Sequence, residues 1–140
     1  MMVLVDTSVW SLALRRRSPD LSFEQDRLRQ VLSELVREGR AQLIGPIRQE
    51  LLSGIREEAQ YRKLRGHLRA FDDVALLTED YEGAASLSNQ CRAEGVTGSP
   101  VDFLICAVSI RCQWPILTTD ADFRVYARRL PIKLLGTAPA

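Results

Sequence analysis

The sequence has few of the residues that many catalytic and metal sites use. It contains one histidine, His67, so cleavage of RNA by a pair of histidines acting as acid and base is excluded. Its three cysteines, Cys91, Cys106 and Cys112, are an odd number at irregular spacing, which fits neither a disulfide framework nor a zinc site. A glycine-rich phosphate loop and a Gly-x-Ser-x-Gly motif are both missing. Chemistry that depends on these groups is therefore not favoured.

The chain also lacks long hydrophobic runs and a strong net charge. No apolar run approaches the roughly 20 residues that span a bilayer, and the first one, Met1 to Val5, is followed at once by Asp6. With the cysteine pattern, this predicts a cytoplasmic protein without a membrane segment. The net charge is +1, although basic residues gather at 15–17 and 56–69. A length of 140 residues, with 46% hydrophobic and 26% charged residues, predicts one globular domain over 1–140.

Short apolar runs alternate with amphipathic stretches along the chain. Strands are predicted at 2–5, 41–44, 74–77, 115–118 and 132–135. Helices are predicted at 8–16, 22–37, from 45, at 58–71, 80–94, 100–112 and from 121. Ser22 and Gln25 form the capping box of the second helix. Alternating strands and helices predict a single-domain α/β/α sandwich with a mainly parallel sheet of about five strands.

Acidic residues follow the predicted strands. Asp6 comes directly after the first strand, and Glu50 lies one turn into the helix after the second. Asp102 is the third residue of the helix at 100–112, and Asp120 and Asp122 follow the fourth strand. Each acid alone is more often a capping residue, which the helix dipole favours. However, the carboxyl ends of parallel strands share one edge of a sheet, so we expect these acids to lie close together.

Clustered carboxylates favour a metal site. Two of them about 4 Å apart repel by about 4 kcal/mol at an effective dielectric constant near 20. A hard divalent cation among them removes this cost, and Mg²⁺ prefers oxygen ligands. Such an ion can polarise a phosphoryl oxygen and activate a bound water molecule. The residues present therefore favour hydrolysis by a metal-activated water molecule.

Four motifs follow one another along the chain: Val-Leu-Val-Asp-Thr-Ser at 3–8, Glu-Leu-Leu-Ser-Gly at 50–54, Val-Asp at 101–102 opening an apolar helix, and Leu-Thr-Thr-Asp-Ala-Asp-Phe at 117–123. Together they resemble a PIN domain, in particular the toxin ribonuclease of a VapBC-type toxin–antitoxin pair. The resemblance covers Val3 to Phe123. One departure is Phe103, which is bulkier than the small residues that commonly follow this acid and is expected to narrow the approach to the site.

The resemblance implies a metal-dependent endoribonuclease that acts on structured RNA such as tRNA or rRNA. It implies that Mg²⁺ or Mn²⁺ is bound by four acids, with a fifth as an auxiliary: Asp6, Glu50, Asp102 and Asp120, then Asp122. It implies that three hydroxyl residues orient carboxylates or water: Thr7, Ser8 and Thr118. Capping is an equally good explanation of these hydroxyls. The family further implies a VapB-type antitoxin as partner and, for many members, a homodimer.

Weaker predictions concern binding of substrate or partner. The candidate residues are Arg15, Arg48, Arg62, Arg65 and Trp10. An apolar helix face is a further candidate for a partner groove or a dimer surface, with core packing as the alternative: Tyr61, Leu64, Leu68 and Phe71.

Two other functions are consistent with parts of the pattern. One is a catalytically silent PIN module that binds RNA or a protein, against which the complete set of acids argues. The other is a phosphoryl-accepting receiver or an aspartyl-phosphate phosphatase. A phosphatase needs a second acid two residues after the first, where this chain has Ser8, and a receiver needs a lysine after its last strand, whereas Lys133 lies within it.

Overall fold

Four parallel strands form the centre of the molecule, in the order β3-β2-β1-β4. They are β1 (Val3–Val5), β2 (Ala41–Ile44), β3 (Asp73–Val74) and β4 (Ile116–Leu117). The computed structural model describes residues 1–14 and 18–136 of the chain. Leu4 in the central strand β1 pairs with Gln42 of β2 on one side and with Ile116 of β4 on the other. The first strand of the sequence therefore connects the two halves of the chain.

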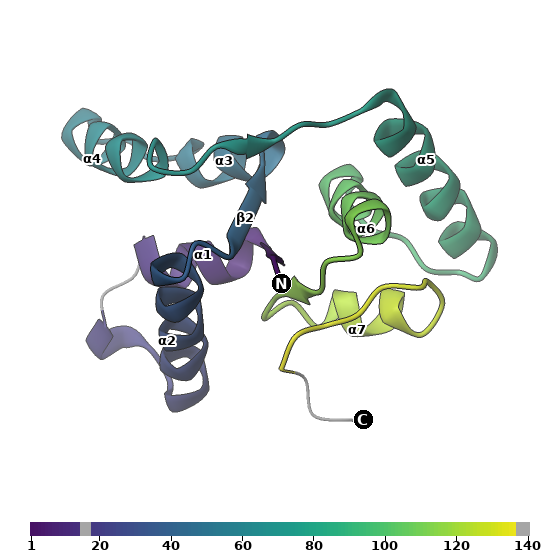
Figure 1. Cartoon of the computed structure of the whole chain (residues 1–140), viewed down its shortest axis with the longest axis horizontal. Helices are drawn as coiled ribbons and strands as arrows, with labels where there is room; N and C mark the ends of the chain where they lie inside the picture. Colours follow the sequence, from purple (N-terminus) through teal and green to yellow (C-terminus); the bar gives the residue numbers. More distant parts are fainter. Residues whose placement is uncertain (15–17, 137–140) are drawn as a thin grey trace.

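Helices cover the sheet. They are α1 (Thr7–Leu14), α2 (Phe23–Arg37), α3 (Gly45–Leu52), α4 (Glu58–Leu68), α5 (Thr78–Ala93), α6 (Pro100–Cys112) and α7 (Asp122–Ala127), with a short 3-10 helix at Ser18–Asp20. In Figure 1, α1 and α2 lie to the left of the strands, and α5 and α6 lie to the right. This arrangement confirms the predicted α/β fold with helices flanking a parallel sheet.

Local sequence signals begin α2, α3 and α6 where they were expected. The Ser22 hydroxyl accepts a hydrogen bond from the Gln25 amide at 3.1 Å, and the Gln25 side chain accepts one from the Ser22 amide at 3.0 Å, which completes the capping box of α2. Pro46 lies in the first turn of α3, where its missing N–H is not needed. Ser99 caps α6 by accepting from the Asp102 amide at 3.1 Å.

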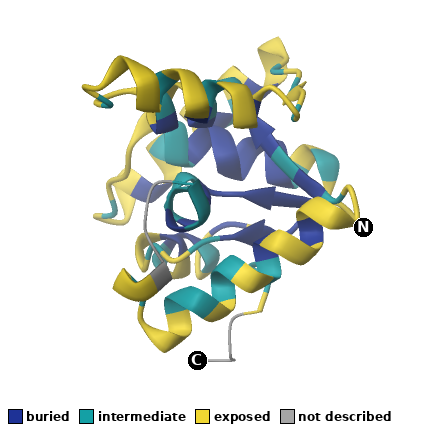
Figure 2. Cartoon of the chain, turned by 90° about the vertical axis from the view of Figure 1, so that its left-hand side faces the viewer, coloured by how far each residue is buried: buried dark blue, intermediate teal, exposed yellow. Residues whose placement is uncertain are grey.

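The hydrophobic core lies along β1 and α6. The side chains of β1 are completely buried, and Figure 2 shows buried strands at the centre under exposed outer helices. Every residue of α6 from Phe103 to Ser109 is also buried, which explains why this helix is apolar all round rather than on one face. Because Asp6 follows β1 and Asp102 lies in the first turn of α6, the core fixes the positions from which both acids extend.

The sheet is narrower than predicted. The expected fifth strand at 132–135 forms only one bridge, between Leu134 and Ile116, because β4 has just two residues and offers a short edge. The expected strand at 74–77 is limited to Asp73–Val74, because the Leu77 amide donates to the Asp80 carboxylate at 2.9 Å and so joins the start of α5.

Two sequence predictions concern the class of protein. None of the helices in the described part of the chain combines the length and the hydrophobicity that crossing a membrane requires. The cysteines are free: Cys91 and Cys106 are buried and Cys112 is half-buried. Burial raises the pKa of the Cys106 thiol well above its ordinary value, so Cys106 stays protonated as a small hydrophobic residue.

Candidate functional site

Asp6 is the most buried of the predicted site acids, at 5% exposed. Its amide donates to the Leu117 carbonyl of β4 at 2.9 Å, which continues the sheet by one residue. Its carboxylate oxygen Oδ2 accepts hydrogen bonds from the Ser8 hydroxyl at 2.7 Å and from the Thr118 hydroxyl at 2.8 Å. The carboxylate is therefore held in one orientation by residues that follow two neighbouring strands.

The same hydroxyl groups connect the start of α1 to the loop after β4. Thr118 Oγ1 accepts from the Asp120 amide at 2.9 Å, and Ser8 Oγ accepts from the Thr119 amide at 3.0 Å. Each hydroxyl thus donates to Asp6 and accepts from the loop after β4. These are the contacts that the predicted orienting role of Ser8 and Thr118 requires, although the role itself remains a prediction.

Three acids from α6, the loop after β4 and α7 converge beside this network. Asp102, Asp120 and Asp122 each place a carboxylate oxygen within 4.8 Å of the other two. The Asp122 amide also donates to Asp120 Oδ1 at 2.9 Å, which holds the two acids of the loop together. Parallel strands thus bring these acids to one edge of the sheet, as their positions after β4 and at the start of α6 suggested.

The electrostatic surroundings of Asp102 extend the cluster to Asp6. Burial raises the pKa of the Asp102 carboxyl above its ordinary value, and the negative charges of Asp6 and Asp120 raise it further. Hydrogen bonds from Tyr126 and Ser99 oppose this rise without cancelling it. The three aspartates therefore share one region of negative potential, in which a cation would be stabilised.

Glu50 is connected to the site through Thr7, the residue that follows Asp6. It is exposed on α3, and its carboxylate accepts a hydrogen bond from the Thr7 hydroxyl at 2.9 Å. Within the described residues, Glu50 and Asp6 are not among the acids whose oxygens all lie within 4.8 Å of one another. The structure therefore groups Asp122 with Asp102 and Asp120, and it places Glu50 on the exposed side next to Thr7.

Comparison with known proteins now identifies the family. The PIN domain model matches residues 3–129, which is most of the chain. The chain belongs to the PIN domain family. Ribonuclease VapC11 of Mycobacterium tuberculosis is 31% identical to this PIN domain over 129 residues, with 91% of this chain and 92% of the relative covered.

Solved structures confirm the fold of this PIN domain. A structure of VapBC2 from Rickettsia felis, bound to a DNA fragment from their promoter, matches with a TM-score of 0.71 at 16% identity and covers 96% of this chain and 97% of that one. A toxin–antitoxin complex from Klebsiella pneumoniae matches with a TM-score of 0.64 at 17% identity, covering 86% and 89%. At such low identity these likenesses establish the fold alone.

Tyr126 was not among the residues predicted for the site, and its hydroxyl donates to Asp102 Oδ2 at 2.8 Å. Tyr126 is fully buried on α7 of this PIN domain. Its spacing of four residues from Asp122 places both on one face of that helix, and this spacing was the only sequence signal that could have indicated it.

The predicted arginine contacts have different surroundings. Arg48 donates to the Asp73 carboxylate at 2.8 Å and to the main-chain carbonyls of Leu68 and Phe71, so it joins α3 to the end of α4. These intramolecular contacts give Arg48 a structural role, and we do not propose it as a contact to substrate. Arg15 lies outside the described residues.

Two further arginines extend from α4. Arg62 forms an exposed ion pair with Glu58 at 2.8 Å, and the Arg65 guanidinium lies 5.7 Å from the centre of the Tyr61 ring. Exposed pairs of this kind hold a side chain weakly, so Arg62 could exchange its partner for a phosphate at little cost. Their predicted role in binding remains untested.

The predicted apolar binding face lies mostly in the core. Leu64 and Leu68 are buried, and Trp10 is 1% exposed with its indole N–H donating to the Val5 carbonyl at 3.1 Å. Trp10 also packs edge-on against Phe71, with ring centres 5.0 Å apart. Core packing therefore describes Leu64, Leu68 and Trp10, whereas Tyr61 and Phe71 are half-buried. Phe103 is likewise buried, so its ring does not narrow the approach to Asp102.

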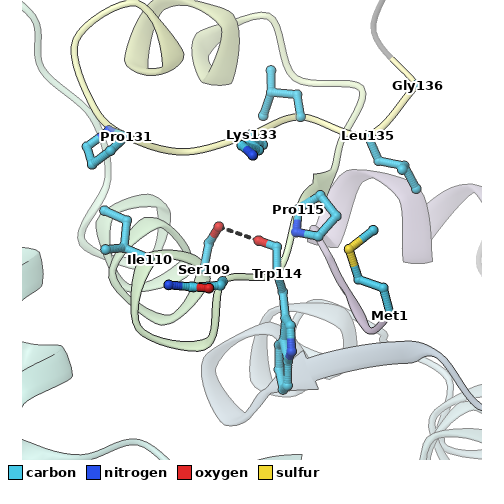
Figure 3. Close-up of a pocket in the computed structure, with 11 residues that line it drawn as sticks. Met1, Ser109, Ile110, Trp114, Pro115, Pro131, Lys133, Leu135 and Gly136 are labelled. Atoms are coloured by element: carbon cyan, nitrogen blue, oxygen red, sulfur yellow. Dashed lines mark hydrogen bonds between the residues drawn. The ribbon is translucent and has the colours of Figure 1, made fainter.

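A separate cavity lies at the opposite end of β4 from the acids. It has a volume of about 690 Å³ between the end of α6 and the segment 131–136 (Figure 3). Ser109 on its wall donates to the Trp114 carbonyl at 2.6 Å. Among the described residues, the lining of the cavity includes no carboxylate, so the cavity is distinct from the acidic site.

Proposed function

We propose that this PIN domain is a metal-dependent endoribonuclease and the toxin of a toxin–antitoxin pair, neutralised by a VapB-type antitoxin. The observation that carries the proposal is the convergence of Asp102, Asp120 and Asp122 within 4.8 Å beside the buried Asp6. The relative VapC11 is named a ribonuclease, and the similar structures are VapBC2 and a toxin–antitoxin complex.

The donor set fits Mg²⁺ or Mn²⁺. All of its groups are carboxylate oxygens, which hard divalent cations prefer, and the described part of the cluster offers neither thiolate nor imidazole, which softer metals favour. Asp102, Asp120 and Asp122 would hold the ion, with Asp6 beside them. When bound, such an ion neutralises charge on a phosphodiester and makes a bound water nucleophilic near neutral pH.

The protein residues have distinct tasks in this proposal. Ser8 and Thr118 fix the Asp6 carboxylate, so that the charge of Asp6 faces the cluster in one orientation. Thr7 holds the exposed Glu50 at the border of the site, where its carboxylate can act on a water molecule or on the substrate. RNA with a structured region, such as tRNA or rRNA, is the proposed substrate.

Cleavage of total RNA by the purified protein tests the activity. We expect discrete fragments with 5′-phosphate ends in Mg²⁺ or Mn²⁺ and none in EDTA. Asp102→Asn and Asp6→Asn should lower the rate by more than about 100-fold, because even residues that only support metal ligands contribute about 10–100-fold. Asp72→Asn is the matched control, because Asp72 is exposed and precedes β3, at the opposite edge of the sheet.

Metal binding is tested by thermal unfolding without RNA. At a concentration of 100 times its Kd, Mn²⁺ should stabilise the wild type by about 2.7 kcal/mol and Asp102→Asn by much less. Metal binding without cleavage of any RNA by a folded, antitoxin-free preparation would support the catalytically silent PIN module instead. Cleavage that persists in EDTA would contradict the proposed chemistry.

A further inference from the structure

The environment of Tyr126 is built around one hydrogen bond. The residue is fully buried, and its ring packs against Phe103 with centres 5.2 Å apart and against Phe123 at 5.3 Å. Its hydroxyl donates to Asp102 Oδ2 at 2.8 Å. Rings on two sides restrict the tyrosine to one rotamer, so the hydroxyl position is set by the core and not by the acid that it contacts.

Gly98 makes room for this hydroxyl. A Cβ atom at position 98 would lie 2.8 Å from Cζ of Tyr126, still closer to its hydroxyl oxygen, and 3.1 Å from Phe103. Real Cβ atoms essentially never approach other atoms as closely as this one would approach Tyr126, and the contact with Phe103 would be unusually tight. The absence of a side chain at Gly98 therefore leaves the room that the hydroxyl needs in this position.

The hydrogen bond joins the two elements that supply the acids. Tyr126 belongs to α7, which begins at Asp122, whereas Asp102 belongs to α6. The Tyr126 hydroxyl is the donor in this bond, and the Asp102 carboxylate is the acceptor. An ionised carboxylate accepts at about four lone-pair positions, so one donated bond leaves capacity for an ion.

We infer that Tyr126, seated against Gly98, is a positioning residue that sets the Asp102 carboxylate at the correct distance from Asp120 and Asp122 for a divalent cation. This inference rests on the proposed function, because it assumes that these acids bind metal. Tyr126 does not touch the reacting atoms and acts through Asp102.

Removal of the hydroxyl tests the inference directly. Tyr126→Phe keeps the buried ring and deletes one oxygen atom. We expect its Kd for Mn²⁺, measured by isothermal titration calorimetry on the folded protein, to rise by about 10–100-fold, the usual effect of losing a hydrogen bond to a metal ligand. Tyr81→Phe is the matched control, since Tyr81 is 54% exposed on α5, and its Kd should equal that of the wild type. RNA cleavage by Tyr126→Phe should recover at saturating Mn²⁺.

A second variant moves the hydroxyl without removing it. Gly98→Ala should also weaken Mn²⁺ binding, and it should add little to Tyr126→Phe in the double variant because both changes act on the same hydrogen bond. Gly83→Ala is its control, since a Cβ at Gly83 would meet Ala107 at an ordinary 3.7 Å.

The outcomes separate the inference from the proposed function. Unchanged Mn²⁺ affinity in folded Tyr126→Phe, with normal binding by the wild type, would overturn the role of Tyr126 alone. Absence of Mn²⁺ binding by the wild type would overturn both.

Discussion

Replacing Arg111 with methionine should strongly destabilise the protein. Asp80 is 2% exposed, and Arg111 donates to both of its carboxylate oxygens, at 2.7 and 2.9 Å. This pair joins the start of α5 to the end of α6, the helix that carries Asp102. In Arg111→Met the carboxylate stays buried and loses its charged partner.

The expected loss of stability follows from how far the two side chains are exposed. Breaking a buried ion pair by removing one partner costs about 3–5 kcal/mol. The Arg111 side chain is 31% exposed, so solvent already weakens the pair and the lower end of that range applies, about 3 kcal/mol. A domain of this size is stable by about 5–15 kcal/mol, so the variant should fold with a Tm lower by roughly 10 °C.

The pH dependence of stability tests independently whether the ion pair between Asp80 and Arg111 stabilises the folded protein. Burial alone raises the pKa of Asp80, but the hydrogen bonds from Arg111 and Leu77 and the charge of Arg111 outweigh it, so the folded pKa lies below the ordinary 3.8. The stabilisation is therefore present above pH 3.8 and is lost as the pH falls through the lowered value. In Arg111→Met burial dominates and raises the pKa, so the difference between the two proteins should shrink as the pH falls from 7 toward 4.

Urea unfolding followed by circular dichroism at pH 7 and pH 4 measures both effects. Arg62→Met is the matched control, because its ion pair with Glu58 is 66% and 76% exposed, and it should lose less than about 1 kcal/mol. The double variant Asp80→Asn/Arg111→Met should recover much of the loss, because it leaves no buried charge. A loss below about 1 kcal/mol in Arg111→Met at pH 7 would refute the reasoning.

Two further predictions concern the site and the core. Thr118→Val removes the hydroxyl that contacts both Asp6 and the Asp120 amide. The rate of RNA cleavage should therefore fall by about 10–100-fold, while the free energy of unfolding falls by only about 1 kcal/mol. A loss of cleavage no larger than the loss of stability accounts for would argue against an orienting role. Trp10→Ala should cost about 3–5 kcal/mol in urea unfolding, because the indole is buried against Phe71, and a change below about 0.5 kcal/mol would instead indicate a surface residue available to a partner.

The order of the acids around the sheet could be predicted from the sequence more fully than the side-chain contacts of the site. Asp6 and Asp120 could be placed together because Asp6 directly follows β1, Asp120 lies in the loop after β4, and parallel strands end at a common edge. Asp102 could be placed by the cap at Ser99 and the proline after it. Local signals of this kind need no knowledge of how the helices pack.

Contacts between helices could not be predicted in the same way. Tyr126 and Asp102 are 24 residues apart, and Arg111 and Asp80 are 31 apart, so neither pair produces a periodic pattern. Which side chains meet depends on the angle and distance between packed helices. The extent of the sheet was overestimated for a related reason. Whether the segment 132–135 forms a strand depends on the length of the strand beside it, β4, and not on the β propensity of the segment itself.

The central position of β1 has a consequence for synthesis of the chain. Thr118 and Asp6 are 112 residues apart, and β1 gains β4 as a neighbour only when residues 116–117 are available. Chains emerge from the ribosome from the N-terminus at about 5–20 residues per second, so β1 waits several seconds for that partner. Until then Asp6 lacks the Thr118 hydroxyl, and Asp120 and Asp122 do not yet exist. A nascent chain therefore carries an incomplete site for nearly all of its synthesis, while it is attached to the largest RNA assembly in the cell.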